Sequence, residues 1–171
     1  FQLETAFQWK KSIRISRTFR EGIHLFSVLT QAMSTYAFMC GAKLRKQRSC
    51  AGTITIFIIT NPFKHECHVN YKGILTISLE TPTNDSLKIV SAAISGLRSI
   101  YRRDCIYKKA GVIVSGIIPQ SQVQLSTFDD IKDLDRRHRL MQAVDAVNES
   151  YGQMKICLGI NGFEQKWKLK Q

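Results

Sequence analysis

The stretch CAGTITIFIIT, residues 50–60, decides the fold. Every second residue from Ile54 to Ile58 is isoleucine, and the residues between them are threonine and phenylalanine. This period of two is typical of a β-strand that buries one face and leaves the other face open. Asn61 and Pro62 follow directly and end the strand, because proline has no backbone N–H to donate to a sheet.

Three further segments show the same alternation, at residues 10–19, 74–80 and 107–118. In the first of them the inward residues are Ile13 and Ile15, and the outward residues are Ser12, Arg14 and Ser16. We therefore predict a first strand whose open face is basic and hydroxylated. The segment at 74–80 is predicted to form a hairpin with the strand at 50–60, joined by a long connection.

Two segments between these strands carry apolar residues three and four positions apart, the spacing of an amphipathic helix. They are residues 25–46 and residues 87–101, and the second is preceded by helix-start residues at 81–85. The order strand, helix, strand, strand, helix, strand predicts an α+β fold of the split βαβ or ferredoxin-like type. This fold has a four-stranded antiparallel sheet with both helices on one face, so the Ser, Thr, Lys and Arg face is left open.

The chain divides into parts around this sheet. We expect a lead-in or linker at 1–9, the sheet domain at 10–119, an exposed connector at 120–130 and a small C-terminal extension at 131–171. The extension is predicted to hold a helix at 134–151 and a short strand at 154–160. Apolar residues recur along that helix at Leu140, Val144, Val147 and Tyr151. Because the extension is too small for a core of its own, we expect it to dock on another surface.

The charge of the chain is strongly basic, with a formal net charge of +12 and an isoelectric point near 9.7. Residues 1–119 hold 17 Lys and Arg against 6 Asp and Glu, a difference of +11. Residues 120–171 hold 8 against 7, a difference of +1. A basic excess of this size predicts a polyanionic partner for residues 1–119, and nucleic acid is favoured over a membrane surface because no basic amphipathic helix carries large apolar anchors.

Other features of the sequence restrict the class of protein. Five cysteines without a CxxC pair are typical of a reducing compartment. His65, Cys67 and His68 lack a second cluster of ligands, so we expect no metal site. The chain has no signal peptide and no apolar run of membrane-spanning length, which predicts a cytoplasmic protein without membrane contact. It begins at Phe1 rather than at a methionine, so we expect it to be part of a longer protein.

The connector contains the peptide Gln124-Leu125-Ser126-Thr127-Phe128. Leu125 and Phe128 stand three residues apart in an otherwise polar segment, and their exposure to water would forgo a few kcal/mol of burial. A pocket on a partner would bury both side chains. The alternative is that they pack on their own domain.

Six segments occur along the chain in a fixed order: KSI at 11–13, RTF at 17–19, TIFIITNPF at 55–63, TPT at 81–83, YKKAGV at 107–112 and QLSTFDD at 124–130. Together they resemble the C-terminal third of the UmuC-like Y-family translesion DNA polymerases, the family of the catalytic subunit of DNA polymerase V. The resemblance implies a little-finger DNA-binding domain, a sliding-clamp peptide and a role in SOS DNA repair and damage tolerance. It also implies primer-template DNA, the sliding clamp, a processed UmuD dimer and RecA as partners.

The resemblance and the predicted faces assign two groups of site residues. The DNA contacts are Lys11, Ser12, Arg14, Ser16, Arg17, Lys108 and Lys109. The clamp contacts are Gln124, Leu125, Ser126, Thr127 and Phe128. Thr127 stands where the clamp peptide usually has a second leucine, which removes roughly 1 kcal/mol of apolar burial. The palm carboxylates that hold Mg²⁺ in this family have no counterpart in the sequence, so we expect no cofactor and no catalytic residue in this chain.

A four-stranded sheet of this type also occurs in RNA-binding proteins and in small hydrolases. A free-standing RNA-binding sheet needs aromatic stacking platforms on its open face, and only Phe57 is placed there by the alternation. A small ferredoxin-like hydrolase needs an anion-binding loop with an arginine beside an asparagine or histidine, and the sequence shows none. Neither class accounts for the six ordered segments.

Overall fold

The computed structural model describes residues 11–60, 70–124 and 130–162. Its elements follow the predicted order through the sheet. They are β1 (Ser12–Ile23), α1 (Phe26–Lys46), β2 (Ser49–Thr60), β3 (Lys72–Thr83), α2 (Ser86–Ile100), β4 (Tyr107–Pro119), η1 (Gln120–Gln122), α3 (Ile131–Tyr151) and η2 (Gly159–Asn161). The strands form one four-stranded sheet in the order β1-β4-β2-β3, and every neighbouring pair is antiparallel. The α+β prediction is therefore confirmed.

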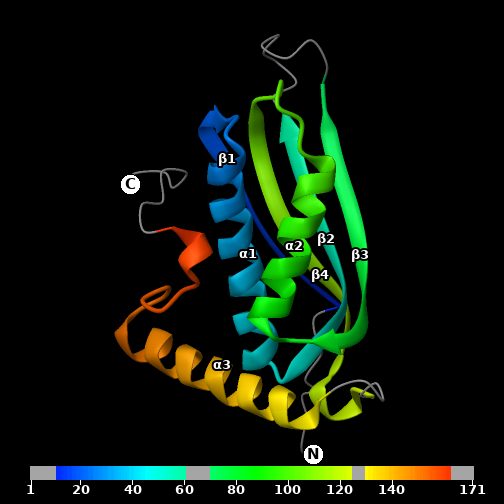
Figure 1. Cartoon of the computed structure of the whole chain (residues 1–171), viewed down its shortest axis with the longest axis vertical. Helices are drawn as coiled ribbons and strands as arrows, with labels where there is room; N and C mark the ends of the chain where they lie inside the picture. Colours follow the sequence, from blue (N-terminus) through cyan, green and yellow to red (C-terminus); the bar gives the residue numbers. More distant parts are fainter. Residues whose placement is uncertain (1–10, 61–69, 125–129, 163–171) are drawn as a thin grey trace, which may run out of the picture.

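Each strand–helix–strand unit is split by a strand of the other unit, because β4 lies between β1 and β2, and β2 lies between β4 and β3. Helices α1 and α2 lie side by side on one face of the sheet (Figure 1). The hairpin between β2 and β3 is formed as predicted, with Ile54 opposite Ile77 and Ile56 opposite Leu75. The opposite face of the sheet is left without a helix, since α3 crosses the ends of α1 and α2 (Figure 1).

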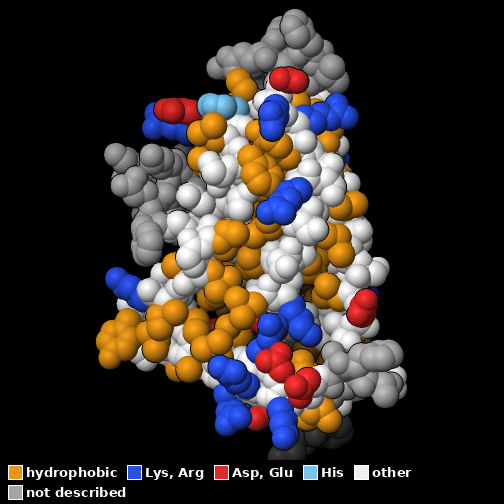
Figure 2. All heavy atoms as spheres, in the orientation of Figure 1, with side chains coloured by type: hydrophobic (Ala, Val, Ile, Leu, Met, Phe, Trp, Pro, Cys, Tyr) orange, Lys and Arg blue, Asp and Glu red, His pale blue; other side chains and the backbone are white. Residues whose placement is uncertain are grey.

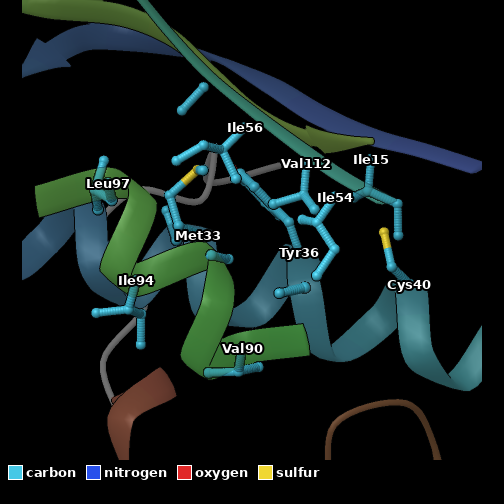
Figure 3. Close-up of a cluster of buried hydrophobic side chains, with 14 of the residues drawn as sticks. Ile15, Met33, Tyr36, Cys40, Ile54, Ile56, Val90, Ile94, Leu97 and Val112 are labelled. Atoms are coloured by element: carbon cyan, nitrogen blue, oxygen red, sulfur yellow. The ribbon is translucent and has the colours of Figure 1, made fainter. Parts of the chain in front are cut away.

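The core lies between the sheet and the two helices (Figure 3). The isoleucines of the 50–60 stretch that were predicted to face inward, Ile54, Ile56 and Ile58, are fully buried. They meet Met33, Tyr36 and Cys40 from α1 and Val90, Ile94 and Leu97 from α2 (Figure 3). Burial of several branched apolar side chains, each contributing about 1.5–3 kcal/mol, is what holds the helices on this face.

The strands extend beyond their predicted ends, and β3 takes in the residues at 81–83 that were expected to begin a helix. Asp85, the last of the predicted helix-start residues 81–85, provides the N-cap of α2, and its carboxylate accepts a hydrogen bond from the Leu87 amide at 2.8 Å. Pro82 is accommodated because β3 is an edge strand with one unpaired side.

The C-terminal extension departs from its prediction in two respects. The strand predicted at 154–160 is not formed, and the 3₁₀ helix η2 lies at its end. The apolar residues Leu140 and Tyr151 of α3 are exposed, while Met141 is the buried side chain of that helix. The expectation that the extension docks is met, because the Ser34 hydroxyl of α1 donates to the Ile160 carbonyl at 3.4 Å and Arg45 of α1 pairs with Asp145 of α3.

Within the described residues, no helix is long and apolar enough to cross a membrane. The same part of the chain contains no group of three His, Cys, Asp or Glu side chains that could hold a metal ion. The histidines and cysteine at 65–68 lie outside the described residues.

Candidate nucleic-acid interface

The open face of the sheet is organised in four cross-strand rows. Residues opposite one another on neighbouring strands place their side chains on the same face, so the strand register identifies the members of each row. Reading from β1 through β4 and β2 to β3, the rows are Thr18–Lys109–Ile59–Lys72, Ser16–Gly111–Phe57–Ile74, Arg14–Ile113–Thr55–Thr76 and Ser12–Ser115–Thr53–Ser78. The face thus carries cations, hydroxyls and a few apolar groups.

The hydroxyl groups on this face bond to one another. Thr53 Oγ1 lies 2.6 Å from Ser115 Oγ, and Thr55 Oγ1 lies 2.8 Å from Thr76 Oγ1. Each hydroxyl can both donate and accept, so such a pair still has an unused hydrogen-bonding position. The middle of the sheet can therefore meet water or a polar partner without burying an unpaired group.

Two lysines share one row. Lys109 on β4 and Lys72 on β3 both stand opposite Ile59 of β2. Neighbouring strands are about 4.8 Å apart, so the two Cα atoms are separated by about 10 Å. Lys72 is exposed and was missed by the sequence analysis, which began this strand at residue 74. The alternation itself contains the signal, since Ile74 and Lys72 are two positions apart and share a face.

Arg14 lies over an aromatic ring on this face. Its Cζ atom is 4.9 Å from the ring centroid of Phe57, whose side chain crosses from β2. Phe57 is 4% exposed although it stands on the open face. The ring lies over Gly111 and beneath the Arg14 guanidinium, so Phe57 is on the open face as predicted but is not available as a platform for an RNA base.

Arg17, which was grouped with the residues of the open face, lies on the opposite side of the sheet. It stands opposite Ala110, a buried residue of the helix-covered face. Burial raises the pKa of the Tyr36 hydroxyl on α1, and the nearby positive charge of Arg17 partly offsets that effect. Arg17 thus belongs to the edge of the α1–β1 packing, while Ser12, Arg14 and Ser16 lie on the open face as predicted.

Lys108 differs from its neighbour Lys109. The pairing of β4 with β2 shifts register between Ile59 and Thr60, and Lys108 is the additional residue at that irregularity. Its ammonium group donates to the carbonyl of Arg20 on β1. Lys108 is therefore held at the end of the β1–β4 pair. Lys11 is exposed and directly precedes β1.

The first half of α3, on the helix-bearing side, has a different charge pattern. Figure 2 shows Lys and Arg side chains interspersed with Asp and Glu over the first half of α3. These charges include the pairs Arg137–Asp133, at 3.1 Å, and Arg139–Asp135, at 2.9 Å. Paired charges of both signs produce little net attraction for a polyanion. By contrast, Arg14, Lys72 and Lys109 of the open face form no ion pair with any residue in 11–60, 70–124 or 130–162.

The connector leaves the sheet at a fixed point. Gln120 follows β4, its amide N–H donates to the Arg48 carbonyl at 3.0 Å, and its side-chain oxygen accepts from Asn84 at 3.2 Å. Gln124 is exposed a few residues later. The other four clamp residues of the sequence analysis, Leu125, Ser126, Thr127 and Phe128, lie outside the described residues.

The sequence of this chain is similar to those of known proteins. Residues 10–127 match the model of the impB/mucB/samB family C-terminal domain, and residues 138–171 match a domain of unknown function, DUF4113. Protein ImpB of Salmonella typhimurium is 33% identical over 171 residues, which cover 99% of this chain and 39% of ImpB. Protein UmuC of Salmonella typhimurium strain LT2 is 31% identical over 170 residues, which cover 99% of this chain and 40% of UmuC. The chain therefore spans about two fifths of the length of these relatives.

A solved structure of a complex between the beta-clamp processivity factor and the little finger domain of PolIV shows a weaker likeness. It has a TM-score of 0.43 and 15% sequence identity, and the match covers 69% of this chain and 99% of that chain.

Proposed function

Because the chain belongs to the impB/mucB/samB family, whose C-terminal domain it matches over residues 10–127, we propose that it is the DNA-binding and sliding-clamp-docking region of a UmuC-like Y-family translesion DNA polymerase. The observation that carries this proposal is the family match, since it spans the whole sheet and most of the clamp-like peptide. The relatives at about 30% identity over nearly all of the chain support it.

DNA would bind on the open face of the sheet. Arg14, Lys72 and Lys109 present unpaired positive charge there, and the threonine and serine hydroxyls add short hydrogen-bonding groups. Such groups recognise phosphate and sugar atoms, which are the same for every base sequence. The proposed binding is therefore strong at low salt and weakly dependent on sequence.

The connector would bind the sliding clamp. Leu125 and Phe128 would fill an apolar pocket on the clamp, and Gln124 would hydrogen-bond at its rim. Because Gln120 is tied to Arg48 and Asn84, the peptide begins close to the base of the sheet domain. DNA on the sheet would then raise the effective concentration of the clamp near the peptide. A processed UmuD dimer and RecA are further partners that we propose from the family alone.

Binding to duplex DNA at increasing salt tests the first half of the proposal. Between about 50 and 200 mM salt we expect the affinity to fall at least tenfold if three or more phosphates are neutralised. We expect Arg14→Ala, Lys72→Ala and Lys109→Ala each to weaken DNA binding. For any one variant, the loss should be the same for duplexes of unrelated sequence. Arg98→Ala is the matched control, because it removes an exposed cation from α2 on the other face of the molecule.

Two outcomes would contradict the interface. One is an affinity that does not change with salt. The other is a loss of affinity in Arg98→Ala as large as the loss in Arg14→Ala, since a general effect of net charge would not distinguish the two faces.

A further inference from the structure

The ring of Phe57 occupies space that every residue except glycine would need at position 111. A Cβ atom built on Gly111 would lie 2.5 Å from Phe57 Cζ and 2.5 Å from Ser16 Cβ. Contacts this short do not occur between real Cβ atoms and their neighbours, so a side chain at position 111 would displace the ring. Phe57 stands opposite Gly111, which stands opposite Ser16. The ring therefore extends from β2 across β4 toward β1.

Arg14 reaches the same ring from the other side. It is on β1, one row away from Ser16, and β1 and β2 are separated by β4. Neighbouring strands are about 4.8 Å apart, so β1 and β2 are about 10 Å apart, and the two side chains meet above β4. They meet with the Arg14 Cζ atom 4.9 Å from the Phe57 ring centroid. The glycine at 111 is what leaves room for this meeting.

The contact with the ring leaves the guanidinium able to bind an anion. An arginine that lies over a ring can still direct N–H groups away from it, where they can form a two-pronged contact with phosphate oxygens. Arg14 makes no side-chain hydrogen bond or ion pair to another described residue that would compete for these N–H groups. A guanidinium that is already placed also loses less conformational freedom when it binds.

We propose that Phe57 and Gly111 are positioning residues that hold the Arg14 guanidinium ready for a phosphate of the nucleic-acid backbone. This inference rests on the proposed function, because it assumes that the open face binds DNA. It assigns a role to an aromatic residue on that face that does not involve contact with a base. Phe57 and Gly111 would act on DNA only through Arg14.

The test measures duplex DNA binding by the full chain and three variants at a fixed, low salt concentration. Phe57→Leu keeps an apolar side chain but removes the flat ring, and Gly111→Ala displaces the ring while leaving it in the chain. We expect each to weaken binding by about two- to fivefold, the range of a cation–π contact at an exposed site. Arg14→Lys keeps the charge and loses the planar group, and it should weaken binding to a similar extent.

A double-mutant cycle separates positioning from a general structural role. In an Arg14→Ala background, Phe57→Leu should cause no further loss of DNA affinity, because its effect passes through Arg14. Leu140→Ala is the control, since Leu140 is an exposed apolar residue of α3, outside the open face of the sheet. It should leave DNA affinity unchanged. Melting temperatures of all variants identify any loss of DNA affinity that comes from unfolding. If Phe57→Leu does not fold, Arg14→Lys still tests the proposal, because it changes an exposed side chain.

Two results would overturn the proposal while leaving the proposed function in place. The first is a folded Phe57→Leu variant that binds DNA as tightly as the wild type, when the wild type itself shows the expected salt-dependent affinity. The second is an equal loss from Phe57→Leu in the presence and absence of Arg14. If the wild-type chain itself does not bind DNA, the proposed function fails and the positioning role fails with it.

Discussion

Arg45 and Asp145 form a two-pronged ion pair that joins α1 to α3. Arg45 Nε donates to Asp145 Oδ2 at 2.6 Å, and Arg45 Nη2 donates to Asp145 Oδ1 at 2.7 Å. The remaining group, Nη1, donates to the Asn84 carbonyl at 2.6 Å and to the Ser86 hydroxyl at 2.9 Å. Arg45 and the start of α2 lie in residues 10–127, which match the family C-terminal domain, and Asp145 lies in residues 138–171, which match DUF4113. The guanidinium therefore connects the two matched regions.

Removal of the Asp145 carboxylate should destabilise the folded chain. The Arg45 side chain is 5% exposed and that of Asp145 is 26% exposed, so Asp145→Ala leaves a buried positive charge without its counter-ion. We expect a loss of about 2–3 kcal/mol in the free energy of unfolding, measured with urea. In the control Asp135→Ala, the lost partner is an exposed pair with Arg139, and the loss should stay below about 0.5 kcal/mol. Equal losses in the two variants would show that the Arg45 pair does not hold α3.

This ion pair could not be predicted from the sequence, because hydrophobic spacing was the signal used for α3. The spacing selected Leu140, Val144, Val147 and Tyr151 as its buried face, yet Leu140 and Tyr151 are exposed. Val144 does pack against the core, next to the buried Met141, and the neighbouring Asp145 pairs with Arg45. Because α3 docks through both apolar contacts and an ion pair, apolar periodicity indicates its contact face only in part.

The sheet was predictable because its signal is strong and local. Alternating isoleucines at 54, 56 and 58 define a buried face, and the same parity places Ser12, Arg14 and Ser16 on the open face. The errors arise where alternation was not followed or is interrupted. Arg17 is three positions from Arg14 and so lies on the other face, and Lys108 occupies an irregularity in register that no local pattern announces. The division into domains and the roles of the site residues stay predictions.

Because several cysteines are buried, we expect the free energy of unfolding to fall at alkaline pH. Burial raises the pKa of the Cys40 thiol from 9.0 to about 12, and that of Cys50 to about 11. Since the unfolded chain ionises first, the stability that these thiols contribute is complete below about pH 9 and is lost as pH rises toward their folded pKa values. At pH 10 the loss should be on the order of 1 kcal/mol for Cys40, measured by urea unfolding.

Two measurements check this assignment. Cys40→Ala should show a smaller fall in unfolding free energy between about pH 8.5 and 10 than the wild type, although it is less stable at neutral pH. In a Cys67→Ser background at about pH 8, a thiol reagent should modify the half-buried Cys157 first and the buried Cys40, Cys50 and Cys105 slowly. Rapid modification of Cys40 in the folded chain would contradict the burial argument.

The clamp peptide supplies the last prediction. A peptide spanning residues 120–130 should bind a purified bacterial sliding clamp with micromolar-range affinity in a calorimeter. We expect a favourable contribution of roughly 4–6 kcal/mol from the burial of Leu125 and Phe128 and one polar contact by Gln124. The cost of ordering a flexible peptide offsets part of this contribution. Phe128→Ala should cost about 2 kcal/mol, because it removes the larger anchor.

Thr127 makes the prediction specific to this sequence. Thr127→Leu should strengthen clamp binding by about 1 kcal/mol, because it restores the apolar burial that the threonine lacks. Ser126→Ala is the matched control and should change the affinity little, since Ser126 only spans the two anchors. If Leu125 and Phe128 instead pack on their own domain, the peptide will not bind at high-micromolar concentration. In that case Phe128→Ala will lower the melting temperature of the intact chain, and the assignment of the connector to the clamp is wrong.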